Sequence, residues 1–439
     1  MCMSSRAFVA LVVTSTCAVT LAACASRATS SGSGGGSGQG SGGHAGSGGQ
    51  AAGSGGKAGP GSGGAATGGA ATGGAATGGA ASGGTAGSVA LANPAPGSRF
   101  FVGANFWNID WEGQGDFFQS GVDFTTTTNP WLPQLLTDLA PYHVLRFPDW
   151  NQINNSNNSQ AVWSTRKQKT APQNEPVAFE WQIDLCNRTK KDYWLNVPHE
   201  ASAAFWTQLA QLVYAQLDPS LRVYLEWSNE VWNGSFPQNA YAMTQGQSLG
   251  LSGSDPAASF YVYQAVRMYE AFEAVFGKGS PRVVKVLAGQ ASYQGPCTDD
   301  IKALSDSTIN PNKTMPTVYA VAPYISGTTV AAVSASIPGI KNWLTTNEAC
   351  AATASLPLVS YEGGSDSFSA TDCQAVQTDS GMHNVYTSYL DALVAGGLQG
   401  PFMQYTHVGS CWGMKVKTSD ANSAAPKYQG MLDWLAAHP

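Results

Sequence analysis

The strongest constraint on the fold is a regular alternation, over residues 91–439, of short apolar runs with longer amphipathic segments. In the amphipathic segments the apolar residues recur three and four positions apart, which is typical of helices that bury one face. Eight strands followed by helices predict an α/β fold of the (β/α)8 TIM-barrel type, with a doubly wound parallel sheet as the alternative. The expected strands are residues 99–104, 143–147, 193–197, 222–227, 283–287, 318–322, 357–360 and 401–405, and the clearest helices are residues 132–140, 202–216, 257–276 and 374–394.

The chain begins with a segment that is typical of an export signal. Arg6 precedes an apolar stretch, residues 7–21, which is too short to span a bilayer as a mature helix. Residues 21–24 form Leu-Ala-Ala-Cys, which resembles the bacterial lipobox; the resemblance implies cleavage after residue 23 and a lipid on the sulfur of Cys24. Because Ala25 follows, it also implies the outer membrane or cell surface. An ordinary cleaved signal peptide with a chance cysteine is the alternative.

The next segment is expected to form a flexible linker. Residues 31–90 contain 27 of the 51 glycines and a single charged side chain, Lys57. Residues 65–84 repeat a five-residue unit, Ala-Ala-Thr-Gly-Gly three times and then Ala-Ala-Ser-Gly-Gly, with too little apolar bulk to offset the entropy of ordering. The predicted organisation is therefore a signal peptide (1–23), a lipidated flexible linker (24–90) and one folded domain (91–439).

The charge of the predicted folded domain excludes one class of partner. Residues 91–439 contain all 28 Asp and Glu but 19 of the 22 Lys and Arg, a net charge of −9 (19 minus 28). Nucleic acid would require a basic stripe, so this balance argues against it and fits a neutral or sugar-like ligand. We expect a monomer that needs no cofactor and that touches the membrane only through its lipid.

Five cysteines lie outside the signal segment, so at most two disulfides can form and one thiol stays free. An exported location permits such bridges. Cys350 and Cys373 flank a predicted strand and are the first expected pair. No Cys-x-x-Cys or His-rich spacing indicates a metal site. The five are Cys186, Cys297, Cys350, Cys373 and Cys411.

Two glutamates stand at the ends of predicted strands, where the side chains of a barrel point into the active-site mouth. The segment Tyr-Leu-Glu-Trp-Ser-Asn-Glu ends at Glu230 among tryptophans, where burial favours a protonated carboxyl group and suits a general acid. The segment Pro-Leu-Val-Ser-Tyr-Glu-Gly-Gly places Glu362 at the tip of a later strand, and its two glycines would let the backbone turn close to a ligand. The 132 residues between the glutamates (362 minus 230) match about three βα units.

These motifs resemble the clan-A glycoside hydrolases. Members of this clan are retaining enzymes on (β/α)8 barrels, with an Asn-Glu acid/base after strand four and a Glu nucleophile after strand seven. Many carry Glu-x-Trp-Asn-Glu-Pro at strand four, and this chain keeps Glu226 and the Asn229-Glu230 pair at the same spacing. Ser228 and Val231 replace the Trp and the Pro, so the exact family stays unassigned.

The resemblance extends over nearly all of residues 99–415 and implies roles for further residues. Arg146, in Leu-Arg-Phe-Pro-Asp-Trp, would hold the nucleophile ionised by charge pairing. His199, after strand three, would contact substrate, and Tyr324, after strand six, would hydrogen-bond the nucleophile. Trp412, after strand eight, occupies the place of the sugar-stacking tryptophan of the clan.

The implied function is a retaining glycosidase that acts on a β-linked polysaccharide or oligosaccharide. Two carboxyl groups about 5 Å apart leave no room for water, so Glu362 would attack the anomeric carbon while Glu230 protonates the leaving oxygen. Glu230 would then activate water. Asn229 would hydrogen-bond the sugar 2-hydroxyl. Trp107 and Trp232 offer flat apolar faces for sugar rings.

Other interpretations remain open at this point. Glu226 is a rival carboxylate, although its deeper position favours a hydrogen-bonded structural role. The sequence is equally compatible with His199 as a site residue and as a buried core histidine, and the adjacent Glu200 is an alternative site residue. Arg146 could serve only to close the barrel with a salt bridge. A catalytically silent carbohydrate-binding (cellulose-binding-like) surface lipoprotein, or a structural lipoprotein with a decayed site, would use the same barrel. The paired glutamates favour the enzyme.

Overall fold

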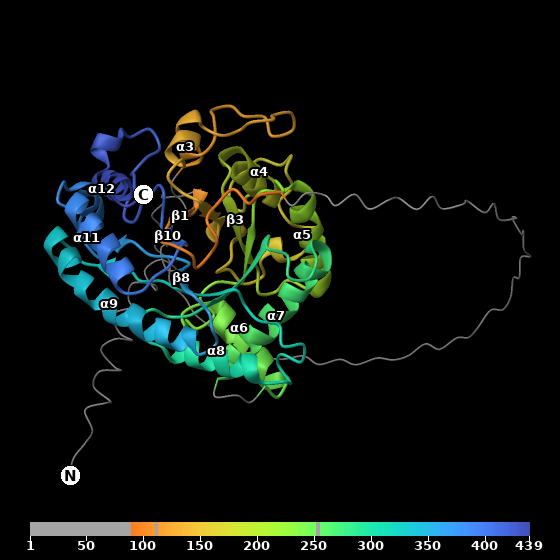
Figure 1. Ribbon diagram of the computed structural model, residues 1–439. Helices are drawn as coiled ribbons and strands as arrows, with labels where there is room; N and C mark the ends of the chain where they lie inside the picture. The colour runs from red at the N-terminus through yellow and green to blue at the C-terminus, as the bar shows by residue number, and fades with distance from the viewer. Residues whose placement is uncertain (1–88, 110–112, 252–254) are drawn as a thin grey trace, which may run out of the picture. The chain divides into compact units, whose positions relative to one another are not determined.

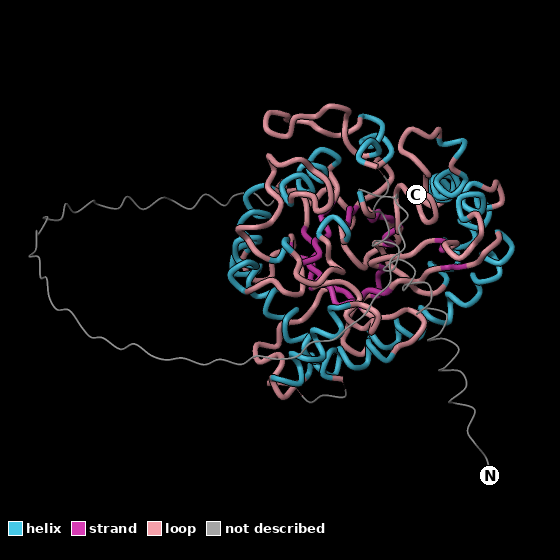
Figure 2. The backbone as a smooth tube through the Cα atoms, turned by 180° about the vertical axis from the view of Figure 1, so that it is seen from behind, coloured by secondary structure: helices cyan, strands magenta, loops and turns pink. Residues whose placement is uncertain are grey.

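The computed structural model describes residues 89–109, 113–251 and 255–439. The predicted signal peptide, Cys24 and nearly all of the predicted linker lie outside the described residues. Within the described residues, eight parallel strands close into a barrel in the order β1-β10-β8-β6-β5-β4-β3-β2. The strands lie at the centre of the fold, and the helices surround them (Figure 1 and Figure 2). The closed ring confirms the expected TIM barrel and excludes the doubly wound sheet.

All eight expected strands are present, and their bounds differ from the expected ones by at most three residues. Two further short strands form a separate parallel sheet beyond β6 and β8. The barrel strands are β1 (Val102–Asn105), β2 (Val144–Arg146), β3 (Asp192–Val197), β4 (Val223–Trp227), β5 (Val283–Ala288), β6 (Val318–Val321), β8 (Leu358–Ser360) and β10 (Phe402–Gln404); the separate sheet consists of β7 (Ile325–Ser326) and β9 (Ser365–Asp366).

The helices confirm the expected pattern with one correction. The Ser202 hydroxyl caps its helix by accepting the Phe205 N–H at 3.2 Å. The single helix expected over residues 374–394 is wrong, because a turn in which Asp379 Oδ1 accepts the Gly381 N–H at 2.8 Å divides it into two. The helices are α3 (Pro133–Asp138), α4 (Phe179–Thr189), α5 (Ala203–Gln216), α6 (Pro237–Ser248), α7 (Pro256–Phe276), α8 (Gly295–Ser305), α9 (Val330–Ala352), α10 (Cys373–Thr378), α11 (Met382–Ala395) and α12 (Pro426–Ala437).

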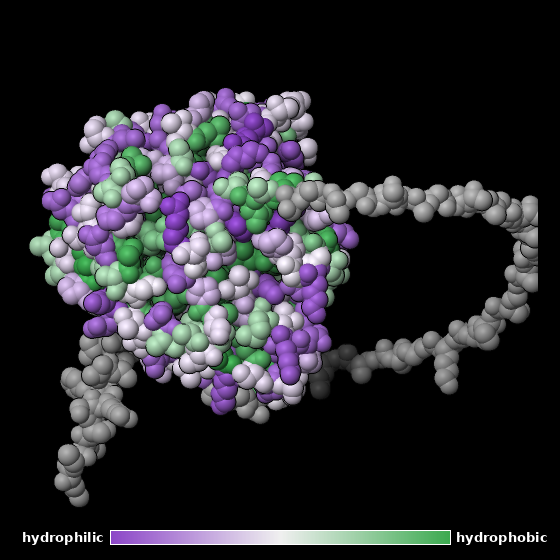
Figure 3. Space-filling view, viewed as in Figure 1, coloured by the Kyte–Doolittle hydropathy of each residue, from purple (hydrophilic) through white to green (hydrophobic). Residues whose placement is uncertain are grey.

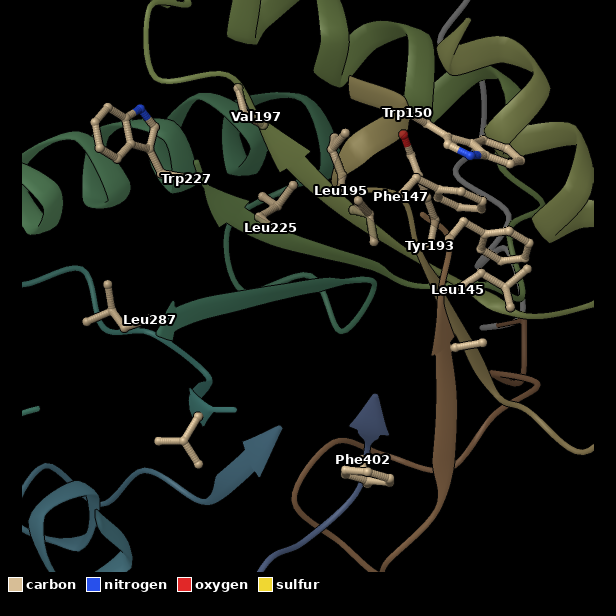
Figure 4. Close-up of a cluster of buried hydrophobic side chains, with 14 of the residues drawn as sticks. Leu145, Phe147, Trp150, Tyr193, Leu195, Val197, Leu225, Trp227, Leu287 and Phe402 are labelled. Atoms are coloured by element: carbon tan, nitrogen blue, oxygen red, sulfur yellow. The ribbon is translucent and has the colours of Figure 1, made fainter. Parts of the chain in front are cut away.

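Alternate residues of each strand pack in two hydrophobic layers, one between the barrel and the helices and one inside the barrel. On β3, Tyr193, Leu195 and Val197 face outward and pack in the layer between barrel and helices, part of which Figure 4 shows. Trp194 faces inward and stacks on Tyr224 of β4 with the ring centroids 5.2 Å apart. The inner layer therefore fills the interior of the barrel, and the polar network described below lies at the C-terminal ends of the strands.

The surface of the described domain is mixed in hydropathy on the face shown. Hydrophilic and hydrophobic residues are interspersed over the face drawn in Figure 3. No helix in the described ranges combines the length and the apolar character that a membrane crossing demands. The described residues also contain no group of three or more His, Cys, Asp or Glu side chains placed to hold a metal ion.

Two disulfides join loops and helices on the outside of the barrel, and they correct the expected pairing. Cys297 pairs with Cys350, with their Cα atoms 6.4 Å apart, and Cys373 pairs with Cys411 at 5.1 Å. Cys186 is the free thiol among the described cysteines and is buried. Cys350 and Cys373 do not pair, because Cys350 lies near the end of α9 and faces α8, whereas Cys373 begins α10 and faces the loop after β10.

The Cys297–Cys350 bridge should stabilise the domain. Replacing both cysteines with serine removes a cross-link over 53 residues, and the loop-closure entropy then returned to the unfolded chain lowers the free energy of unfolding by about 4 kcal/mol. Denaturant titration of oxidised protein measures this loss. The matched control is Cys186→Ser, which removes a thiol without removing a bridge. Equal stability of the double variant and the wild type under oxidising conditions would show that the bridge does not form.

Candidate active site

Arg146 lies at the centre of a polar network formed where the barrel strands end. It is the last residue of β2 and is fully buried. Its Nη1 donates to Glu362 Oε1 at 2.6 Å and to Asn105 Oδ1 at 2.9 Å, and its Nη2 donates to Asn229 Oδ1 at 2.7 Å. Burial alone would lower the pKa of Arg146, but the charges of Glu226 and Glu362 outweigh it and raise that pKa. The permanently charged side chain of Arg146 on β2 therefore binds side chains from β1, from β4 and the turn after it, and from the segment after β8.

Glu362 follows β8 by two residues and is 7% exposed. Besides the ion pair with Arg146, its Oε2 accepts the Tyr324 hydroxyl at 2.8 Å. Tyr324 follows β6, and burial together with the charge of Glu362 raises its pKa well above the ordinary value, so it stays a donor. The structure thus places Arg146 and Tyr324 on Glu362, in the contacts that the sequence resemblance implied.

The two glycines after Glu362 serve a packing purpose that differs from the expected one. A Cβ on Gly363 would lie 2.6 Å from the Phe402 ring, and a Cβ on Gly364 would lie 2.4 Å from Gln404 Nε2. Gly364 also has a φ of 138°, which L side chains rarely adopt. These glycines therefore allow the neighbouring strand β10 to approach, rather than a ligand.

Glu226 forms the floor of the site. It is fully buried within β4, and its carboxylate accepts hydrogen bonds from Arg146 Nε at 3.0 Å, Trp194 Nε1 at 2.8 Å and Asn196 Nδ2 at 2.9 Å. With its oxygens engaged in this way and no exposure to solvent, it has no free face toward a substrate. The geometry supports the structural interpretation of Glu226, and the rival catalytic interpretation loses its basis.

Glu230 sits on an unusual backbone turn after β4. Ser228 has a φ of 64° and Glu230 a φ of 44°, both in the left-handed region that side chains other than glycine seldom occupy. Such strain tends to persist at functional sites. The turn directs the Glu230 carboxyl group toward Tyr361, whose hydroxyl donates to Oε1 at 2.9 Å, and toward Asn233, whose Nδ2 donates to Oε2 at 3.0 Å.

The two glutamates differ in their electrostatic surroundings. Burial and the charge of Glu362 raise the pKa of Glu230 to about 7, against the opposing effects of Asn233, Tyr361 and Arg146. Glu230 has no direct ion pair, whereas Glu362 has one with Arg146. Around neutral pH, Glu230 therefore holds its proton far more readily than an ordinary glutamate, beside a carboxylate that is paired with a cation.

The raised pKa of Glu230 predicts a pH-dependent cost in stability. A group whose pKa is higher in the folded state binds protons more tightly there, so the stability falls as the pH rises from about 4.5 to about 7 and then levels off. Glu230→Gln should therefore raise the free energy of unfolding by about 2–3 kcal/mol at pH 8 and leave it nearly unchanged at pH 4. Denaturant titrations at both pH values test this, with exposed Glu348→Gln as the control; an equal gain at both pH values would contradict it.

Asn229 is held by its neighbours on both sides. Its Oδ1 accepts from Arg146, and its Nδ2 donates to Asn154 Oδ1 at 3.2 Å. Gln238, fully buried at the start of α6, donates to the same Asn154 oxygen at 2.7 Å and to the Asn229 carbonyl at 2.6 Å. This fixes the amide orientation of Asn229 and leaves one N–H of its side chain for a ligand. Sequence reasoning missed Asn154, which lies in a loop 75 positions from Asn229, and Gln238, which lies on α6 nine positions after it.

Tyr405 is an aromatic residue of the site that sequence reasoning also missed. It directly follows β10, and its ring lies 6.3 Å from that of Tyr324. Trp412 lies behind it at 6.4 Å, is only 6% exposed and stacks on Phe368 at 5.0 Å. Trp107 is half-buried and meets Trp412 edge-on at 5.0 Å. Trp107, Trp412 and Tyr405 therefore form one aromatic cluster, which reaches Tyr324 through Tyr405.

His199 is not brought to the two glutamates. It is 2% exposed and packs against the Tyr241 ring on α6 at 5.1 Å, and burial lowers its pKa. No hydrogen bond joins it to either glutamate within the described residues. The neighbouring Glu200 accepts the backbone N–H groups of Asn157 and Asn158 at 3.0 and 2.9 Å, which orders the long loop after β2. His199 therefore packs against α6, and Glu200 holds the loop after β2.

Asp149 is a third carboxyl group at the site. It begins a 3-10 helix (Asp149–Asn151) after β2, and its Oδ2 accepts the Tyr405 hydroxyl at 3.3 Å. Burial and the charge of Glu362 raise its pKa to about 7, against the opposing effects of Arg146 and Tyr405. Its position three residues after Arg146, at a strand end, was a signal that the sequence carried. Asp149 gives the site a second group that titrates near neutral pH.

Comparison with known proteins supports the fold and leaves the family open. No protein-family model and no curated protein matches the chain. A family 51 α-L-arabinofuranosidase from Bifidobacterium longum is similar over 78% of this chain and 75% of its own, with 12% identity and a TM-score of 0.51. A 4-O-α-L-rhamnosyl-β-D-glucuronidase from Fusarium oxysporum (15% identity, 78% and 73%, TM-score 0.46) and a GH5-4 endoglucanase from Clostridium longisporum (12%, 78% and 99%, 0.44) also match. At this identity the likeness to the arabinofuranosidase shows the barrel fold.

Proposed function

We propose that this chain is a retaining glycoside hydrolase that acts on a β-linked polysaccharide or oligosaccharide. The observation that carries the proposal is the pair of glutamates at the barrel mouth, one ion-paired with Arg146 and the other with a pKa raised to about 7. Such an unequal pair is what acid and nucleophile roles require. The solved structures that share this fold are glycosidases by their descriptions, which accords with the proposal.

The reaction follows from these contacts. Glu362, whose negative charge Arg146 and Tyr324 stabilise, attacks the anomeric carbon, while the proton on Glu230 moves to the departing glycosidic oxygen. The products of this step are a glycosyl ester on Glu362 and a free leaving group. Glu230, now ionised, takes a proton from water, which attacks the same carbon and releases the sugar with retained configuration. Tyr361 and Asn233 orient the Glu230 carboxyl group through both steps.

A substrate panel tests the proposal. Wild type and Glu230→Ala are incubated with aryl β-glycosides and with xylan, mannan and cellulose-type polysaccharides, and the anomer released first is identified by NMR. We expect the wild type to hydrolyse its substrate with retention, and Glu230→Ala to lose hydrolysis of the polysaccharide, whose leaving group needs a proton, while it keeps part of the activity on activated aryl glycosides. If neither protein hydrolyses any substrate while a polysaccharide still binds, the chain is a carbohydrate-binding protein instead.

We also propose that the chain is an exported lipoprotein, attached to the outer membrane or cell surface through Cys24, and that it acts as a monomer. The support is the sequence alone, namely Leu-Ala-Ala-Cys at the end of an apolar segment and a long glycine-rich tract after it. Cell fractionation of the wild type and Cys24→Ala tests the anchor. We expect the variant to leave the membrane fraction; retention there would contradict a lipid on Cys24.

A further inference from the structure

A cavity of about 230 Å³ lies beside Glu230 and has no part in the chemistry described above. Its walls come from the turn after β4, from the loop after β5 and from the first turns of α7 and α8. This volume is below the roughly 300–1,000 Å³ of pockets for drug-sized ligands, so it suits a single sugar ring. The lining residues are Val231, Trp232, Asp255, Ala257, Ala258, Tyr261, Ala288, Gln290, Tyr293, Gly295, Pro296, Asp299 and Asp300.

The cavity lies on the side of the general acid and away from the nucleophile. Val231 and Trp232 directly follow Glu230, and Ala288 ends β5 within the inner layer of the barrel. None of the described lining residues belongs to β8 or β10, which carry the surroundings of Glu362. Since the acid must reach the glycosidic oxygen, the space beyond it is where the leaving part of a substrate extends.

Two aromatic side chains give this cavity surfaces for a sugar. Trp232 is half-buried in its wall, and Tyr293 is 63% exposed, the highest exposure among the large hydrophobic residues described. A Cβ on Gly295 would lie 2.3 Å from the Tyr293 ring, so the ring lies directly over the first residue of α8. Flat rings of this kind pack against the apolar faces of sugars.

The cavity is acidic. Asp255 caps α7 by accepting the Ala257 N–H at 2.8 Å, and Asp300 accepts the Tyr319 hydroxyl at 3.0 Å. All three line the cavity, but burial, followed by the charges of Asp299 and Asp255, raises the pKa of Asp300 well above its ordinary value, so Asp300 is neutral and Asp255 and Asp299 carry the negative charge. No Lys or Arg is among the described residues that line it. An anionic ligand would therefore meet repulsion without any compensating cation.

We propose that this cavity is the leaving-group subsite, and that it accepts a neutral or amine-bearing sugar and rejects an acidic one. The assignment as a leaving-group subsite rests on the proposed hydrolase function. The charge selection rests on Asp255 and Asp299 and on the absence of a cation among the described lining residues, and the sugar class rests on Trp232 and Tyr293.

A binding experiment tests the subsite without requiring catalysis. Saturation-transfer NMR measures the affinity of three probes, methyl β-D-glucoside, methyl 2-amino-2-deoxy-β-D-glucoside and methyl β-D-glucuronide. We expect the first two to bind and the glucuronide to be rejected. Tyr293→Ala should weaken binding of the first two about 3- to 10-fold, whereas Tyr214→Ala, another exposed tyrosine that lies outside the cavity, should leave it unchanged.

Two results would overturn the proposal. One is glucuronide binding as tight as glucoside binding; the other is equal affinity in Tyr293→Ala and Tyr214→Ala. Asp299→Asn, which removes one charge and keeps the shape, should admit the glucuronide, and continued rejection of that probe by the variant would contradict the charge argument.

A kinetic comparison separates this proposal from the hydrolase proposal. For the sugar that the substrate panel identifies, Tyr293→Ala should lower kcat/KM on an oligosaccharide and leave hydrolysis of the glycosyl fluoride unchanged, because fluoride does not occupy the cavity. Equal losses on both substrates would contradict a leaving-group subsite. If the wild type hydrolyses neither the oligosaccharide nor the glycosyl fluoride, the hydrolase proposal is wrong. The probe-binding result would still decide whether the cavity binds a sugar.

Discussion

Replacing Glu362 with glutamine should lower kcat by about four orders of magnitude, equivalent to about 5.5 kcal/mol of lost transition-state stabilisation. The amide has nearly the same shape. Its oxygen can still accept from Arg146, and its NH2 group can donate to the Tyr324 hydroxyl oxygen, so the fold should survive. It carries no negative charge, however, and cannot form the glycosyl ester. Steady-state hydrolysis of an aryl β-glycoside measures the loss, with thermal unfolding as the check on folding.

The smaller variant Glu362→Ala separates a nucleophile from a merely structural carboxylate. It leaves space beside the anomeric carbon, so azide should restore turnover and give a glycosyl azide of inverted configuration. Glu348→Gln, on the exposed face of α9, is the matched control and should retain full activity. If Glu362→Gln keeps more than a tenth of the wild-type kcat, or if azide gives no inverted product, Glu362 is not the nucleophile.

The barrel could be predicted because its signal is local. Each strand is a short apolar run that ends near a turn or polar residue, and both faces of a barrel strand are buried, so the run is nearly continuous. Helices were harder. α9 was not singled out because it is rich in Ala, Ser and Thr and contains Pro338, so its apolar periodicity is weak. The break between α10 and α11 depends on one side-chain turn at Asp379, which periodicity does not reveal.

The site was predictable where strand ends determine it. Glu230, Glu362, Arg146 and Tyr324 all lie at or just beyond barrel strands, and closure of the barrel brings such residues together. Residues that depend on the folded path of a loop were not predictable. Asn154, in the long loop after β2, contacts Asn229 across 75 positions of sequence.

The predicted disulfide pairing was wrong for a related reason. Proximity along the chain suggested Cys350 with Cys373, but the packing of α8, α9 and α10 places their actual partners elsewhere. Side-chain contacts made through tertiary packing leave no mark in a local pattern.

The largest pH effect should come from Glu230→Gln. Loss of the acid should reduce kcat/KM by about 10²–10⁴-fold for a glycoside with a poor leaving group, and much less for one with an activated aryl group that needs no proton. In the wild type, activity requires the protonated acid, so kcat/KM should fall as the pH rises through about 7. In Glu230→Gln this alkaline decline should disappear.

Asp149 makes the assignment of that alkaline decline a real test, because its pKa is also raised to about 7. If Glu230 is the acid, the alkaline decline in kcat/KM should persist in Asp149→Asn. A decline that persists in Glu230→Gln and disappears in Asp149→Asn would show instead that Asp149 is the group that titrates. Asn233→Ala adds an independent check. Its side chain donates to Glu230 and favours the ionised form, so its removal should shift the decline to higher pH. A shift to lower pH would mean that the group that titrates is not the carboxyl that Asn233 contacts.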